Sequence, residues 1–117
     1  MNTESTITVT AGSDQVTLVN VFTVAPERQG DLLTALDNAT AEVFITVPGF
    51  ISANLHASLD GTRVINYAQW SSEQAYQDAM GRPEIRDHVR QAAALAEGYD
   101  PTLAQVRAIH HSGDAHK

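Results

Sequence analysis

The sequence contains no cysteine, which excludes disulfides, thiolate nucleophiles and metal or iron–sulfur sites held by cysteine. This absence fits a cytoplasmic protein. Basic residues are also scarce, with 7 Lys and Arg against 14 Asp and Glu and a formal net charge of −7. Such an acidic chain is not expected to bind nucleic acid. The N-terminal residues resemble no secretory leader and no apolar run approaches a membrane span, so we expect no membrane partner.

Several catalytic and cofactor motifs are missing as well. There is no glycine-rich phosphate loop, no Gly-x-Ser-x-Gly nucleophile elbow and no His-Glu-x-x-His metal motif. The 5 histidines show no compact ligand spacing, although an iron site of histidine and carboxylate assembled in three dimensions stays open. A chain of 117 residues suits one domain with little room for a large enclosed cavity, so a sizeable ligand favours help from a partner subunit.

The hydrophobic pattern predicts a single domain over residues 16–111, between a flexible arm at 1–15 and a disordered tail at 112–117. Strands are expected at 16–24, 50–59, 62–70 and 103–111, and helices at 26–47 and 72–97, the second interrupted near 81–83. This β-α-β-β-α-β order is the ferredoxin-like split arrangement of the α+β class, with both helices on one face of an antiparallel sheet. Two such sheets packed face to face would form a homodimeric α+β barrel.

An Asp-Gly pair at positions 60–61 lies between two alternating runs, which is a strong hairpin signal. A two-residue turn there predicts that Asn66 and Trp70 share one face of the sheet. It places Phe50 and His56 on the opposite face. A longer loop or a bulge would change these assignments, because a shift of one residue exchanges the two faces.

The run from Asn66 to Trp70 places an amide and the only tryptophan on one otherwise apolar strand face. Asn20 interrupts the apolar face of the first strand, which is the neighbour of the third strand in a split βαβ sheet. The two amides can therefore meet below Trp70 as convergent hydrogen-bonding groups in an apolar pocket. The alternative is structural, because a buried tryptophan is usually core and a buried amide usually ties down a bulge or a loop.

Further polar groups accompany the helices that follow. Tyr76 lies one turn after Trp70, so its ring is expected in the core with its hydroxyl in reach of the pocket. Arg86 and His88 flank the apolar stripe of the last helix on opposite sides, and Arg90 lies further round. A solvated position is the usual fate of any one of these charges.

Four segments together carry a family resemblance: Val-Pro-Gly-Phe at 47–50, His-Ala-Ser-Leu-Asp-Gly-Thr at 56–62, Asn-Tyr-Ala-Gln-Trp at 66–70 and Ser-Glu-Gln-Ala-Tyr at 72–76. They closely resemble the antibiotic biosynthesis monooxygenases, in particular the small quinone-forming enzymes of aromatic polyketide pathways. The resemblance implies a homodimeric α+β barrel with a pocket in each subunit. It also implies oxidation of anthrone-type or tetracenone-type phenols to quinones with O2, without metal, flavin or haem.

The resemblance assigns site residues too. The catalytic amides and indole of the family correspond to Asn20, Asn66 and Trp70. A tyrosine and a histidine in or near the pocket fall on Tyr76 and His56, although the strand register puts His56 on the face away from Asn66. No metal ligand is implied.

The helix arginine of the family falls on Arg90 without a gap, and on Arg86 with a gap of one turn near 81–83. The implied mechanism is driven by the substrate. Its phenolate, stabilised by hydrogen bonds, passes an electron to O2, and radical recombination gives a hydroperoxide that loses water to yield the quinone.

Three alternatives stay open. Haem-degrading enzymes share the fold, but they require a histidine where this chain has Met80. A dimeric binding module would hold an aromatic ligand without reaction. An aromatic polyketide cyclase would need acid–base groups in the pocket but no O2.

Overall fold

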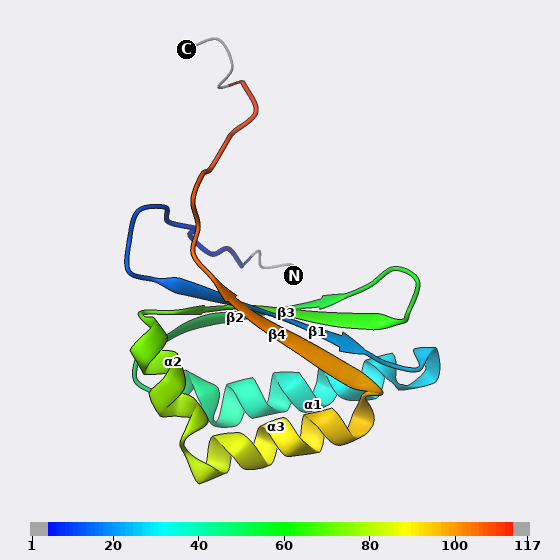
Figure 1. Cartoon of the computed structure of the whole chain (residues 1–117). Helices are drawn as coiled ribbons and strands as arrows, with labels where there is room; N and C mark the ends of the chain where they lie inside the picture. Colours follow the sequence, from blue (N-terminus) through cyan, green and yellow to red (C-terminus); the bar gives the residue numbers. More distant parts are fainter. Residues whose placement is uncertain (1–4, 114–117) are drawn as a thin grey trace.

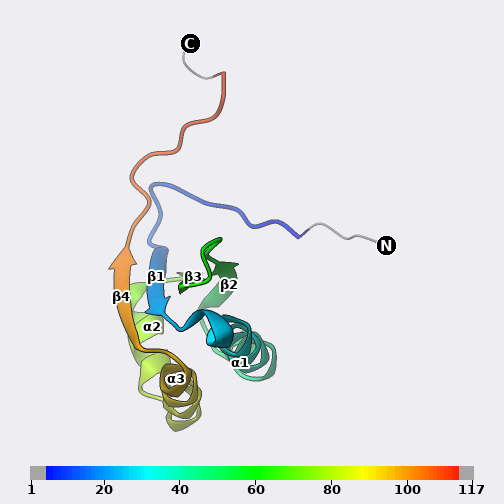
Figure 2. The same ribbon diagram turned by 90° about the vertical axis from the view of Figure 1, so that its right-hand side faces the viewer.

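A computed structural model describes residues 5–113 of the chain. Its four strands form one antiparallel sheet in the order β2-β3-β1-β4, and the helices cover one face of that sheet (Figures 1 and 2). The elements are β1 (Val16–Thr23), η1 (Pro26–Arg28), α1 (Gln29–Glu42), η2 (Phe44–Thr46), β2 (Phe50–Ala57), β3 (Arg63–Trp70), α2 (Glu73–Met80), α3 (Pro83–Leu95) and β4 (Gly98–Ala104). This confirms the predicted α+β class and its ferredoxin-like strand order. No helix among the described residues is long and apolar enough to cross a bilayer.

The first helix is shorter than predicted. Helix α1 ends at Glu42, and the 3₁₀ turn η2 follows it at Phe44–Thr46. Residues 43–47 are all β-branched or aromatic, which disfavours a continued α-helix. As a result, Phe44 turns towards the interior and Ile45 is exposed.

The start of α2 also differs by one residue from the expectation. The helix begins at Glu73 instead of residue 72, and Ser72 caps it: Ser72 Oγ accepts a hydrogen bond from the Ala75 backbone N–H at 3.1 Å. Gly49 packs against this first turn with φ +84°, and a Cβ there would overlap Ala75. The Gly49 carbonyl accepts from the Ser71 N–H at 2.8 Å, which attaches the start of β2 to the start of α2.

The predicted position of the last strand is wrong. Strand β4 spans Gly98–Ala104 and pairs with β1, with Gly98 opposite Thr23 and Ala104 opposite Thr17. It cannot continue as a paired strand to residue 111 because β1 begins at Val16. Residues 105–113 instead extend away from the body of the molecule (Figure 1). Proline is tolerated in β4 because β4 is an edge strand. In such a strand some backbone N–H groups face solvent and make no hydrogen bond within the sheet, so proline can take one of those positions.

The hairpin between β2 and β3 has the predicted register, with Leu55 opposite Asn66. Its loop is longer than two residues, since the Gly61 N–H bonds to the Ser58 carbonyl at 3.1 Å. A bulge interrupts the register between Phe50 and Ser52 and puts Phe50 opposite Trp70. The expected location of Phe50 on the other face is therefore wrong.

Two hydrophobic clusters fill the space between the sheet and the helices. Along β1, Asn20 lies between Leu18 of one cluster and Phe22 of the other. Asn66 is its direct partner on β3. The two amides therefore lie where the hydrophobic core is divided.

The opposite side of the sheet, which we call the open face, has no helix over it (Figure 2). Gln69 is only 4% exposed there, because its Oε1 accepts from Ser52 Oγ at 2.6 Å and its Nε2 donates to the Thr8 carbonyl at 2.8 Å. Asn54 Nδ2 donates to the Tyr67 carbonyl at 2.8 Å and to Ser52 Oγ at 3.0 Å. These bonds hold part of the N-terminal arm against the sheet. Residues 5–15 contain no strand, residues 1–4 and 114–117 lie outside the described part, and the flexibility of the arm and tail stays a prediction.

Candidate active site

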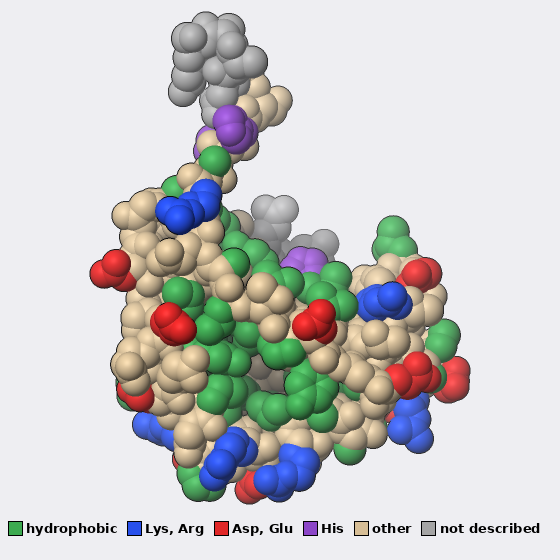
Figure 3. All heavy atoms as spheres, viewed as in Figure 1, with side chains coloured by type: hydrophobic (Ala, Val, Ile, Leu, Met, Phe, Trp, Pro, Cys, Tyr) green, Lys and Arg blue, Asp and Glu red, His purple; other side chains and the backbone are tan. Residues whose placement is uncertain are grey.

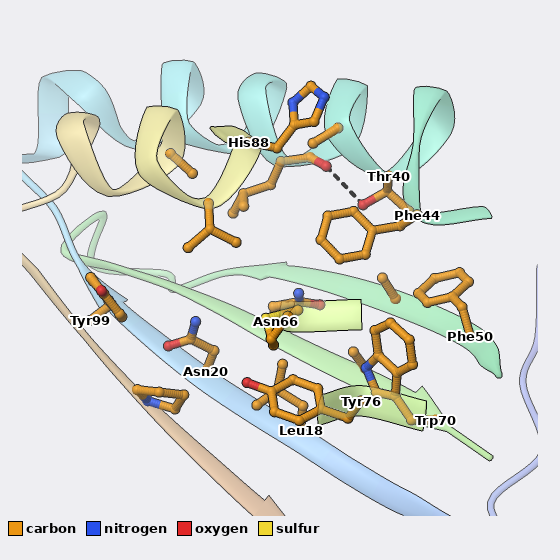
Figure 4. A pocket seen from close by; sticks show the side chains of 18 of the residues that line it. Leu18, Asn20, Thr40, Phe44, Phe50, Asn66, Trp70, Tyr76, His88 and Tyr99 are labelled. Carbon is orange, nitrogen blue, oxygen red and sulfur yellow. Dashed lines mark hydrogen bonds between the residues drawn. The ribbon is translucent and has the colours of Figure 1, made fainter. Parts of the chain in front are cut away.

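A cavity of about 110 Å³ lies between the sheet and the helices (Figure 4). This is several times the roughly 10–15 Å³ that one water requires. Strands β1 and β3 supply its floor, and helices α1, α2 and α3 supply side chains opposite and beside that floor. The lining is mainly apolar and aromatic, with a few polar groups, which is the usual composition of a site for an organic ligand.

Asn20 and Asn66 form the polar part of the floor. They are direct partners in the antiparallel register of β1 and β3, so their Cβ atoms are neighbours on one face of the sheet. Figure 4 shows both amides pointing from their strands into the cavity. The structure thus brings together the two amides that strand alternation places on one face.

Trp70 lies at one end of the cavity, where its side chain is 1% exposed. We call its surroundings the aromatic cluster. The ring of Trp70 meets Phe50 and Tyr76 edge to face at centroid distances of 5.4 and 5.8 Å, and Phe44 at 6.4 Å. The bulge in β2, the turn η2 and the first turn of α2 each contribute one of these rings, so three separate local features close this end.

Three side-chain atoms within residues 5–113 are fully buried without a hydrogen-bond partner: Asn20 Oδ1, Asn66 Oδ1 and Trp70 Nε1. An unpartnered buried polar group costs about 1–3 kcal/mol, and folded proteins contain few of them. A structural amide would have its partners within the fold, so these atoms do not fit the structural alternative. They fit a site whose ligand supplies the missing hydrogen bonds.

Tyr76 lines the cavity next to Trp70 (Figure 4). Burial of the side chain raises the pKa of Tyr76 above its ordinary value of 10.0. A phenol is neutral at physiological pH even at its ordinary pKa, and this shift favours the neutral form further, so the hydroxyl is able to donate a hydrogen bond into the cavity.

Three other predicted site residues lie outside the cavity. Arg86 and Arg90 are exposed on α3, and Arg90 Nη1 pairs with Asp87 Oδ1 at 2.9 Å. His56 is exposed on the open face, with its Nδ1 at 3.0 Å from the Asn54 carbonyl oxygen. The helix periodicity and the strand register explain these positions, because neither arginine lies on the inner stripe of α3 and His56 points away from Asn66.

The sequence analysis did not place several lining residues that the structure reveals. Tyr99 and Pro101 line the cavity from β4 and were missed because the last strand was predicted too late in the chain. His88 also lines it, but its ring extends towards α1 and away from the amides (Figure 4). Thr40 Oγ1 is already bonded to the Leu36 carbonyl at 2.8 Å. Of these four residues, only His88 had a signal in the sequence. The apolar periodicity of α3 puts it beside the inner stripe.

The cavity opens between β4 and α3. Figure 3 shows a hollow rimmed by apolar side chains on the side where these two elements lie together in Figures 1 and 2. Among the described residues, no group of three or more His, Asp or Glu side chains is placed to hold a metal ion. The cavity is thus an apolar site with amide, indole and phenol groups.

Comparisons with known proteins agree with this site. The sequence model of the antibiotic biosynthesis monooxygenases matches residues 15–91. Tetracenomycin-F1 monooxygenase of Streptomyces glaucescens is 43% identical over 81 residues, which cover 69% of this chain and 72% of that protein. The chain therefore belongs to the antibiotic biosynthesis monooxygenase family. This confirms the family that the sequence predicts, and with it an enzyme of the monooxygenase class.

Two solved structures are similar to the whole domain. The monooxygenase ActVA-Orf6 of Streptomyces coelicolor, in complex with the ligand nanaomycin D, is 35% identical with a TM-score of 0.71, covering 86% of this chain and 94% of that one. A mutant of SnoaB of Streptomyces nogalater, a cofactor-independent oxygenase, is 27% identical with a TM-score of 0.73, covering 83% of this chain and 97% of that one. Both support a monooxygenase of aromatic polyketide biosynthesis.

Proposed function

We propose that this chain oxidises a phenolic, anthrone-type intermediate of an aromatic polyketide pathway to a quinone, using O2 and no cofactor. The observation that carries the proposal is that three residues lining one apolar cavity, Asn20, Asn66 and Trp70, each have a buried side-chain atom without a hydrogen-bond partner. These atoms are the two amide oxygens and the indole nitrogen. The relatives named above act on tetracenomycin F1 or hold nanaomycin D. One of them is a cofactor-independent oxygenase.

The proposed role of the site is to favour the substrate anion. An anthrone tautomerises to a phenol, whose hydroxyl would donate to an amide oxygen, Oδ1 of Asn20 or Asn66. As the proton leaves, the indole N–H and the N–H groups of the same two amides would hydrogen-bond the phenolate oxygen. Fixed donors in an apolar, water-poor cavity stabilise such an anion more than water does. The neutral hydroxyl of Tyr76 adds a further donor beside Trp70.

The remaining steps use only the substrate and O2. The electron-rich anion transfers one electron to O2, and the resulting radical and superoxide combine at the carbon opposite the oxygen. Protonation gives a hydroperoxide, which loses water to form the second carbonyl group. One oxygen atom of O2 enters the quinone and the other leaves in water, so the reaction needs no external reductant.

Oxygen uptake by the metal-stripped protein with 1,8-dihydroxyanthrone tests this proposal. We expect one O2 consumed for each quinone formed, and no turnover under argon. Turnover to a cyclised product under argon would indicate a cyclase instead. Binding without turnover in air would indicate a binding module, and a Soret shift on haem titration would favour a haem-degrading enzyme.

We also propose that the active form is a homodimer built through the open face. Val19 lies opposite Tyr67 and Val21 opposite Ile65, so four half-buried side chains form an apolar patch with no helix over it. A second copy packed there would complete the α+β barrel. Light scattering should give twice the chain mass of 12.6 kDa, and Ile65→Lys should give the monomer. A monomeric wild-type protein would contradict the proposal.

A further inference from the structure

The two ends of the cavity differ in closure. The aromatic cluster closes the end near Trp70. The opposite end lies at β4, an edge strand of the sheet, where Tyr99 lines the cavity and is nevertheless 51% exposed. Figure 4 shows Tyr99 and Trp70 on either side of the two amides. A ligand bound to the amides therefore has only one of these two directions in which to extend.

The enclosed volume is small for the proposed ligands. It is about 110 Å³, whereas pockets that enclose a drug-sized molecule begin at about 300 Å³. A phenol with three or more fused rings would therefore extend out of the open end. In the register of β1 and β4, Pro101 is opposite Asn20 and Tyr99 is opposite Phe22, so this path runs past the side chains of β4.

The ring of Tyr99 has a defined position at this opening. It contacts the buried ring of Phe22 at a centroid distance of 6.0 Å and an interplanar angle of 37°. Phe22 belongs to the hydrophobic core, so it restricts the Tyr99 ring from the inner side. A half-exposed aromatic ring held in this way offers an apolar surface to a flat ligand at little cost in side-chain freedom.

We propose that Tyr99 is a specificity-determining residue that packs on the substrate rings extending from the cavity, and so selects polycyclic over smaller phenols. The identity of the ligand rests on the proposed function. Tyr99 lies at the end of the cavity away from Trp70. Its contact with the extending rings is therefore equally strong in the bound substrate and in the transition state. Its loss should therefore raise KM and leave kcat unchanged.

Equilibrium binding of quinones tests the inference without any turnover. Trp70 is the only tryptophan, so quenching of its emission reports occupation of the cavity. Tyr99→Ala should raise the Kd of 1,8-dihydroxyanthraquinone about tenfold. The same variant should change the Kd of the two-ring 5-hydroxy-1,4-naphthoquinone less than twofold. Tyr99→Phe should match wild type for both ligands, as should Leu59→Ala on the exposed loop between β2 and β3.

The outcomes separate the inference from the function on which it rests. An equal change for both quinones, or none for the three-ring quinone, would overturn the role of Tyr99 while wild-type binding and O2 uptake still support the oxygenase. A fall in kcat of Tyr99→Ala at unchanged KM would also overturn it. If neither quinone bound to the wild-type protein, the proposed function and this inference would fail together.

Discussion

The two faces of the sheet differ in whether their buried polar side chains have hydrogen-bond partners. Gln69 and Trp70 are adjacent in β3 and almost equally buried, at 4% and 1% exposed. On the open face, Gln69 uses both its oxygen and its nitrogen in hydrogen bonds within the chain. On the cavity face, Trp70 Nε1 has no partner.

The amides repeat this contrast. Asn54 on the open face bonds to a backbone carbonyl and a hydroxyl, whereas the oxygens of Asn20 and Asn66 on the cavity face are buried without partners. Residue type does not explain the difference, because asparagine occurs with partners on one face and without them on the other. The strand does not explain it either, because β3 carries both Gln69 and Trp70. A polar group that is costly to bury and stabilises nothing within the fold is better explained by a ligand than by structure.

The largest expected effect comes from removing one cavity amide. Asn66→Ala should lower the rate of O2 uptake with 1,8-dihydroxyanthrone about 100-fold, because one of few fixed donors to the developing anion is lost. Asn54→Ala is the matched control on the open face and should keep the wild-type rate. Similar rates for Asn66→Ala and Asn54→Ala, both folded by circular dichroism, would remove the functional distinction between the faces.

Stability should respond with opposite signs on the two faces. Gln69→Leu breaks two hydrogen bonds and should lower the free energy of unfolding by about 2 kcal/mol. Asn66→Leu replaces an amide with an unpartnered oxygen by an apolar side chain of similar size, and should raise it by up to about 1 kcal/mol. Urea unfolding measures both, and a loss of stability in Asn66→Leu as large as that in Gln69→Leu would mean that Asn66 is structural.

Trp70→Phe separates the indole N–H from the ring. An aromatic ring remains within the aromatic cluster, but the donor is gone, so we expect kcat to fall about tenfold, the effect of losing one modest hydrogen bond. Steady-state O2 uptake gives kcat and KM separately. An unchanged kcat in a folded Trp70→Phe variant would limit the indole to packing.

The smallest expected effect is on the free energy of unfolding at alkaline pH. The raised pKa of Tyr76 means that, as the pH rises past 10.0, the unfolded chain releases the phenol proton before the folded chain does. The free energy of unfolding should therefore be unaffected by this group below pH 10.0 and fall as the pH rises through the raised value. Tyr76→Phe should flatten this decline in urea midpoints, and an identical decline in the variant would contradict it.

The sequence predicts the floor of the cavity well, for a physical reason. Strand alternation and the neighbouring positions of the first and third strands suffice to bring Asn20 and Asn66 onto one face. Helix periodicity likewise places Tyr76 near Trp70. These are short-range regularities that depend little on the remaining fold.

The two ends of the cavity were not predictable in the same way. The bulge that turns Phe50 towards Trp70 is a local departure from alternation, and no residue type marks it. The position of Tyr99 depends on the long-range pairing of β4 with β1, while Asp100 and Pro101 resemble turn residues. For Arg86 and Arg90 the discrepancy has a different origin. The family resemblance suggested an arginine in the pocket, whereas the structure exposes both residues on the outside of α3.

The central claim is that the unpartnered groups on the cavity face are ligand-binding groups. Because Trp70 is the only tryptophan, the protein has a single indole N–H signal in its ¹H–¹⁵N NMR spectrum. Binding of 1,8-dihydroxyanthraquinone should move this proton downfield, as a new hydrogen bond requires, while the side-chain amide signals of Gln69 and Asn54 stay in place. An indole signal that does not move while the quinone is bound would contradict the account.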